Sequence, residues 1–182
     1  MTVPDVSLLA ATHPRDAAYD VILLAHVLAA VFSLGALVIA GANAWTLSRS
    51  GPGPEPIRRY YRPGVNWAGK VLFLVPVLGF ALMALSHGDW SFSDGWITVG
   101  LALWAVVAVA AEMYLWPAER RLQVAVTSLT ALAPVDGGEE GTAPVAAPVG
   151  AGLRTECLRV AALAAALSVV LVVVAVVMVA KP

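Results

Sequence analysis

Four long runs of apolar residues dominate the chain, and charged residues, proline or glycine separate each run from the next. The runs extend from about Tyr19 to Leu47, Gly69 to Ser86, Gly95 to Trp116 and Leu158 to Ala180. Each approaches or exceeds the ~20 residues that an α-helix needs to cross the hydrocarbon core of a bilayer. The pattern therefore predicts an all-α integral membrane protein, a four-helix bundle.

The polar segments divide the chain into four parts. Residues 1–18 hold proline and aspartate without a hydrophobic period, which predicts a flexible tail. Residues 19–132 are predicted to form three transmembrane helices followed by a cytoplasmic amphipathic segment. Residues 133–152 are rich in Pro, Gly and Ala, as a flexible linker is, and residues 153–182 hold the fourth helix. Almost nothing remains for a separate soluble domain, so any function must lie in the bundle or its loops.

Two prolines interrupt the predicted helices. Pro76 removes a backbone donor in the second span, where we expect a bend and a neighbour that satisfies the freed carbonyl. Pro117 is expected to end the third span. Beyond it, apolar residues at helical spacing predict an amphipathic helix on the membrane surface: Leu122, Val126, Leu129 and Leu132. In the fourth span the expected packing stripe consists of small residues, Ala161, Ala165 and Ser168.

Basic residues gather on two of the three connections. They are Arg49, Arg58, Arg59, Arg62 and Lys70 around the first, and Arg120, Arg121, Arg154 and Arg159 around the third. The opposite face holds only Arg15 and Lys181. The positive-inside rule then predicts cytoplasmic connections and both termini on the outer side. Lys is much rarer than Arg, and Ala, Val and Gly are abundant, which is the composition expected of GC-rich codons. This composition suggests a bacterial source. We therefore expect a multi-pass protein of the bacterial inner (plasma) membrane.

The composition supports a lipid environment and excludes several classes of function. Hydrophobic residues make up 60% of the chain and charged residues 13%, against about 25% charged in soluble domains. The net charge is −1 and the basic residues form no single patch, so no nucleic-acid partner is expected. Cys157 is the only cysteine, which excludes an internal disulfide or a thiolate cluster. We expect it to be a buried or interfacial bystander.

His26 is an ionisable residue inside the first span, where such groups are costly and often mark function. Helical steps from it meet small or polar residues: Ala29, Ala30, Ser33, Ala36, Ala40 and Asn43. Such a face packs against other helices, so His26 is expected to point into the bundle. Two interpretations stay open: a histidine that hydrogen-bonds a neighbouring helix, or an axial haem or copper ligand.

Ligand partners for His26 are available near the outer ends of the other spans. His87 lies at the lip of the second span, Met83 about one turn deeper, and Met178 near that level in the fourth span. A cofactor or metal site of His26, His87 and Met83 would suit copper, and His with His or Met would suit haem iron.

Lys70 and Glu112 form a second pair of ionisable residues. Lys70 lies 16 residues before Ser86, and Glu112 lies 16 residues after Trp96, so each is about 24 Å from the outer lip. The shared depth predicts a structural ion pair that offsets the cost of both charges. The alternative makes Glu112 a proton carrier, for which only Ser33 and Asn43 offer further polar steps toward His26.

The first span also resembles the opening helix of a group of bacterial membrane proteins. The resemblance rests on residues 24–35, Leu-Ala-His-Val-Leu-Ala-Ala-Val-Phe-Ser-Leu-Gly. The group contains CopD-type copper-resistance domains, HemJ-type protoporphyrinogen oxidases and a family of predicted four-helix membrane proteins without an assigned function. Residues 94–104 and 117–122 resemble the last of these most closely. Only His26 can be transferred from the group's pattern, which usually has two glycines where this chain has Ser-Leu-Gly.

These observations support two classes of function. The first is a non-enzymatic membrane protein, namely a scaffold, an assembly factor or a small permeation element, as a homo-oligomer or within a larger membrane complex. The alternative is a haem-binding or copper-handling membrane redox protein that uses His26. A transporter ranks third, because four helices with one acid in the membrane make a poor alternating-access core.

Overall fold

The computed structural model of the chain describes residues 17–52, 54–64, 67–86, 88–131 and 150–180. Four helices within this part are long and apolar enough to cross a membrane: Ala17–Ser50, Trp67–Leu85, Gly95–Ala131 and Ala151–Ala180. The predicted all-α four-helix bundle is therefore confirmed. Most of the predicted tail and linker lie outside the described residues, and α-helix already begins at Ala17 and at Ala151.

The first and fourth spans are single helices, α1 (Ala17–Ser50) and α7 (Ala151–Ala180). The second span consists of α3 (Trp67–Lys70), a 3₁₀ turn η2 (Val71–Phe73) and α4 (Leu74–Leu85). The third consists of α5 (Gly95–Ala110), a π-helical turn η3 (Ala111–Leu115) and α6 (Trp116–Ala131). A short helix, α2 (Glu55–Tyr60), lies in the connection between the first two spans.

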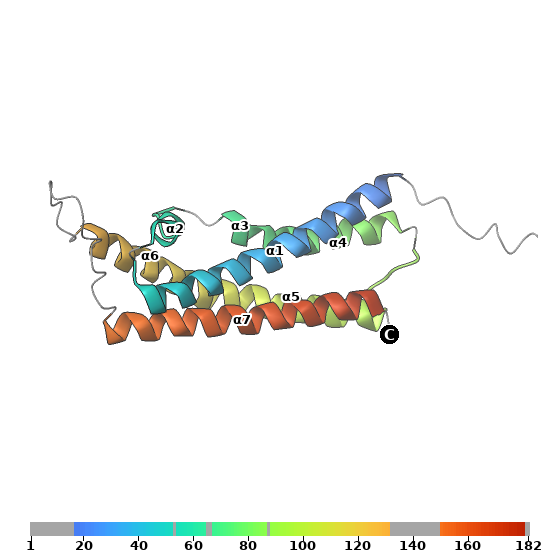
Figure 1. Cartoon of the computed structure of the whole chain (residues 1–182). Coiled ribbons are helices and arrows are strands. Elements are labelled where there is room, and N and C mark those ends of the chain that lie inside the picture. Colours follow the sequence, from blue (N-terminus) through green and yellow to red (C-terminus); the bar gives the residue numbers. More distant parts are fainter. Residues whose placement is uncertain (1–16, 53, 65–66, 87, 132–149, 181–182) are drawn as a thin grey trace, which may run out of the picture.

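The spans run roughly along one direction and leave two distinct ends (Figure 1). At one end, here the terminal end, α1 begins and α7 finishes. At the other, here the loop end, α1 finishes beside α2, α6 and the start of α7. α1 packs mainly on α7 and α4, and α7 also packs on α5. The basic residues of the first and third connections therefore meet at the loop end.

Small residues bring α1 and α7 into close contact. A Cβ atom built on Gly41 would lie 3.1 Å from the Cβ of Ala164 and 3.6 Å from the backbone oxygen of Ala161. On α7 the buried residues are Cys157, Val160, Ala164 and Leu167. The predicted stripe through Ala165 is wrong, because Ala165 is exposed and Ala164 occupies the contact.

Pro76 frees the backbone carbonyl of Leu72, four residues earlier, because proline has no N–H to donate to it. The indole Nε1 of Trp104, on α5, donates a hydrogen bond of 3.0 Å to this carbonyl oxygen. The sequence-based expectation that a neighbour would satisfy the freed group is confirmed. The hydrogen bond also ties the second span to the third.

Pro117 does not end the third span, contrary to the prediction from the sequence. Within η3 the N–H of Trp116 reaches back to the carbonyl of Ala111, five residues earlier, and the helix continues through Pro117 to Ala131. A π turn changes the hydrogen-bond pattern just before the proline, so the missing N–H does not stop the helix.

The first two residues of the apolar stripe of α6, Leu122 and Val126, are covered by protein. Leu122 and Val126 are buried in the core together with Ile57 and Tyr61 from the α2 region. Leu129 is exposed, and Leu132 lies outside the described residues. The spacing predicts the helix correctly, but protein from α2 and α7 covers these apolar residues in place of lipid.

Candidate functional site

The second span packs mainly on the first. α4 packs on α1 and, outside its own span, makes no comparable contact with another described helix. Three polar side chains from the neighbouring spans bind it instead: His26 of α1, Trp104 of α5 and Glu112 of η3. We call these three residues the polar anchors of the second span.

His26 binds the backbone of α4. Its Nδ1 lies 2.9 Å from the carbonyl oxygen of Val75, and a carbonyl can only accept, so Nδ1 is the donor. In the neutral imidazole this leaves Nε2 with a lone pair. Gly79 makes room for the ring, because a Cβ built there would lie 3.4 Å from the His26 Cε1. His26 therefore points into the bundle, as the small-residue stripe predicted.

The predicted ligand partners do not gather around His26 in the described part of the chain. Val75, Gly79 and Met83 follow one another at four-residue intervals, so all three lie on one face of α4. His26 meets this face one to two turns deeper than Met83, about 6 to 12 Å along the helix. The expected pairing of His26 with Met83 is therefore not seen, because α1 and α4 cross so that His26 contacts Val75 and Gly79.

The other proposed partners give no ligand set either. His87 lies outside the described residues. Met178 packs against Gly100 of α5, where a Cβ atom would come within 2.3 Å of the methionine Cε, so its side chain belongs to the contact between α5 and α7. Among the described residues, no three His, Cys, Asp or Glu side chains are grouped as metal ligands.

Lys70 and Glu112 meet as the sequence predicted. The Lys70 Nζ lies 3.1 Å from Glu112 Oε2 and 3.8 Å from the centre of the Trp116 ring. Phe73 packs edge-on or tilted against both Trp104 and Trp116, so the pair borders a cluster of aromatic rings. Both charged side chains are partly exposed, by 32% and 53%. The ammonium group is thus held by a carboxylate and an aromatic face together.

The polar residues considered for a proton path bond to their own helix. Ser33 Oγ donates to the carbonyl of Ala29 at 2.7 Å, and Asn43 Nδ2 donates to the carbonyl of Ile39 at 3.0 Å. These are local backbone bonds that satisfy a side chain within a helix. Glu112 is paired with Lys70. Ser33, Asn43 and Glu112 therefore each have a hydrogen-bond or ion-pair partner close by.

A further polar cluster at the loop end was not found from the sequence. The Tyr60 hydroxyl donates a hydrogen bond of 2.5 Å to the Glu119 carboxylate. Glu119 is buried and only 3% exposed. Tyr61 is buried next to Tyr60. Burial raises the pKa of the Tyr61 phenol well above its ordinary value, and the nearby Cys157 and Glu119 raise it further. Cys157 is buried and free, as predicted. The cluster fastens α2 to α6.

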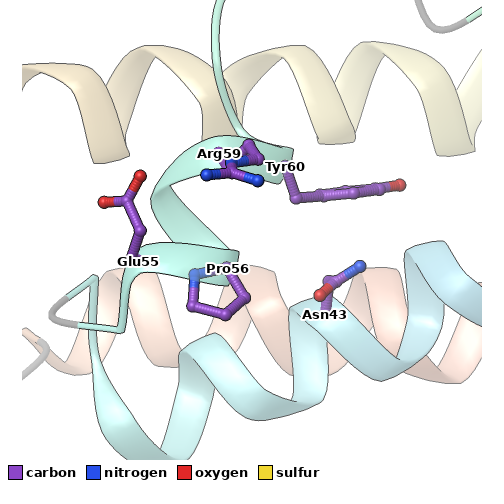
Figure 2. Close-up of a pocket in the computed structure, with 5 residues that line it drawn as sticks. All are labelled: Asn43, Glu55, Pro56, Arg59 and Tyr60. Carbon is purple, nitrogen blue, oxygen red and sulfur yellow. The ribbon is translucent and has the colours of Figure 1, made fainter.

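α2 borders two shallow grooves. The groove between α1 and α2 has a volume of about 580 Å³ and is lined by Asn43, Glu55, Pro56, Arg59 and Tyr60 (Figure 2). The groove between α2 and α6 has a volume of about 500 Å³ and is lined by residues that include Arg58, Arg62, Val126 and Thr127. Both lie at the loop end, where the basic residues gather.

Comparison of the chain with protein-family models, with curated proteins and with solved structures finds no match. Its function must therefore be inferred from the chemistry of its own residues.

Breaking the ion pair should reveal coupling between the second and third spans. Glu112→Gln and Lys70→Met should each lower the free energy of unfolding by about 1 kcal/mol. This value is close to that of exposed ion pairs, because both side chains are partly exposed. The double variant should recover about half of the summed loss, because neither charge is then left alone. Unfolding of the detergent-solubilised protein in SDS measures all four forms. Strictly additive losses would contradict a direct interaction.

Proposed function

We propose that this chain is a non-enzymatic scaffold or assembly element of a membrane, acting as a homo-oligomer or within a larger membrane complex. One observation carries the proposal: His26, Trp104 and Glu112 are all used to attach the second span to its neighbours. Polar groups in a membrane usually mark a substrate path or a cofactor. In this bundle these three connect helices.

The surface of the bundle supports a role in contact with lipid or other membrane helices. Large apolar side chains are exposed along the outward faces of α4 and α7, among them Val77, Phe80, Val173 and Val176. Such surfaces suit lipid, and they also suit packing against another transmembrane helix, where van der Waals contact and polar bonds drive association.

We further propose the bacterial inner membrane as its location, with both termini outside. The support is the positive-inside rule together with the position of the basic connections at a single end of the bundle. A reporter fused after Ser50 should then be cytoplasmic, and one fused after Asp89 should be external. The opposite result at both positions would invert the orientation.

The bond from His26 to Val75 also favours the alternative, a haem-binding or copper-handling protein. In a histidine that binds a metal, the N–H of the other ring nitrogen usually donates a hydrogen bond to a carbonyl or carboxylate. This bond fixes the tautomer. His26 has this arrangement, with Nε2 free to act as a ligand. The metal's further ligands would be groups other than Met83, because Met83 lies one to two turns from the level of His26 on α4. A bound haem or copper would supply one-electron chemistry.

One preparation distinguishes the two functions. The protein is purified from cells supplied with copper and a haem precursor, then analysed for its absorption spectrum and its metal content. The scaffold proposal expects neither a haem band nor stoichiometric copper. It also expects His26→Ala to cost about 0.6 to 1 kcal/mol of stability, the value of a hydrogen bond between helices in lipid.

A cofactor that disappears in His26→Ala, without loss of expression or helicity, would instead establish the redox function. Met178→Leu serves as the control and should leave the cofactor bound, because the Met178 side chain packs on Gly100 of α5. Proton or cation flux into liposomes that contain the wild-type protein would contradict the scaffold proposal and favour a permeation element.

A further inference from the structure

The groove between α1 and α2 holds an unpaired cation. Arg58 forms an ion pair with Glu55 at 2.6 Å, so the carboxylate at the mouth of the groove is already neutralised. The next residue, Arg59, is exposed and its side chain makes no ion pair or hydrogen bond with a described residue. An exposed guanidinium in a concave site is suited to bind a phosphate oxygen pair.

Asn43 of α1 lines the same groove as Arg59. In Figure 2 the amide of Asn43 rises from α1 toward the ring of Tyr60, which comes from α2 beside Arg59. Asn43 uses one N–H on the carbonyl of Ile39, which leaves its second N–H and its oxygen without a partner among the described residues. The two helices thus contribute a cation and an amide to the same groove.

The groove lies at the level where lipid headgroups are expected. Trp45, two residues after Asn43, is half exposed and carries the Arg49 guanidinium 5.9 Å above its ring. Trp67, at the start of the second span, is 75% exposed. Tryptophan and arginine of this kind concentrate at the boundary between hydrocarbon and headgroups. A ligand of Arg59 would therefore be in contact with the bilayer.

An apolar track leads from the groove toward the terminal end. Ile39 and Phe32 precede Asn43 by four and eleven residues, so they share its face of α1. They are 53% and 65% exposed. This face can hold an acyl chain directly below the polar groove, which a free phosphate ion would not use.

We propose that the groove binds an anionic phospholipid, with its phosphate on Arg59 and Asn43 and an acyl chain along Ile39 and Phe32. Anionic lipids are attracted to basic segments beside transmembrane helices, and the groove adds a defined polar site to that attraction. The lipid would contact α2 and α1 together, whereas the Tyr60–Glu119 bond joins α2 to α6. The inference does not depend on the scaffold proposal.

Binding of phosphatidylglycerol to the full chain in detergent, measured by native mass spectrometry, tests the site. Arg59→Gln should weaken binding about tenfold, the value of a charge-assisted hydrogen bond. Arg154→Gln is the matched control, because Arg154 is an exposed arginine at the loop end that does not line the groove. At 150 mM salt it should change binding by at most about twofold, since distant exposed charges are screened over about 8 Å.

Two further measurements identify the ligand. Ile39→Gln should weaken binding of phosphatidylglycerol, and phosphatidylcholine should bind less tightly than phosphatidylglycerol to the wild-type protein. Equal losses in Arg59→Gln and Arg154→Gln would overturn the proposal in favour of non-specific attraction. Suppose instead that inorganic phosphate displaces phosphatidylglycerol at the same concentration and that Ile39→Gln does not weaken lipid binding. The groove would then bind a free anion, and the proposal would be overturned.

Discussion

Replacing Gly41 with leucine is expected to push α1 away from α7 and to lower the free energy of unfolding by about 3 kcal/mol or more. A Cβ at this position would already meet the Cβ of Ala164 at 3.1 Å and the backbone of Ala161 beyond it. The remaining atoms of a leucine would need space that the backbone of α7 occupies. Unfolding in SDS, monitored by far-UV circular dichroism, measures the loss.

Gly35→Leu provides the matched control. It makes the same change in the same helix, but nothing lies within 4 Å of a Cβ built there. Its expected effect is a small gain in stability, because leucine is a better helix former than glycine by about 0.8 kcal/mol. Equal losses in both variants would mean that α1 and α7 do not approach each other at Gly41.

Trp104→Phe is expected to cost about 1 to 3 kcal/mol, because it leaves the Leu72 carbonyl without a donor inside the membrane. Phenylalanine retains an aromatic ring against Phe73, so the change mainly removes the indole N–H. The same measurement of unfolding in SDS applies.

A second substitution identifies the cause of that loss. Pro76→Ala restores the backbone N–H that an α-helix directs at the carbonyl of Leu72, four residues earlier. In this background Trp104→Phe should cost less than about 1 kcal/mol. A loss that is unchanged by Pro76→Ala would show that Trp104 stabilises the bundle by packing alone.

The four spans could be predicted from the length of their apolar runs. The ion pair could be predicted from the number of residues that separate each partner from the short connector. Apolar runs of sufficient length predict membrane helices without knowledge of their neighbours. The short connector between the second and third spans fixes the relative depth of Lys70 and Glu112 and therefore predicts their pairing. His26 was oriented by the small residues that follow it at helical spacing.

Other features depend on partners that no local pattern reveals. From Val160 to Ala180, α7 is apolar on all sides apart from Ser168, so this stretch does not distinguish Ala164 from Ala165 as the packing position. The bond between Tyr60 and Glu119 joins residues 59 positions apart, on two segments that were assigned to loop and membrane surface. Pro56 near the start of α2 was an available signal, since proline favours the first turn of a helix.

The π turn at Ala111–Leu115 changes the rotational phase of the third span. It contains one more residue than an α-helical turn, so residues after it are displaced by about 100° around the axis relative to an uninterrupted α-helix. Without that displacement, Glu119 would be directed away from Tyr60, and Leu122 away from Ile57. One additional residue therefore lets a single continuous helix present one side to α7 and, farther along, a different side to the connection that carries α2.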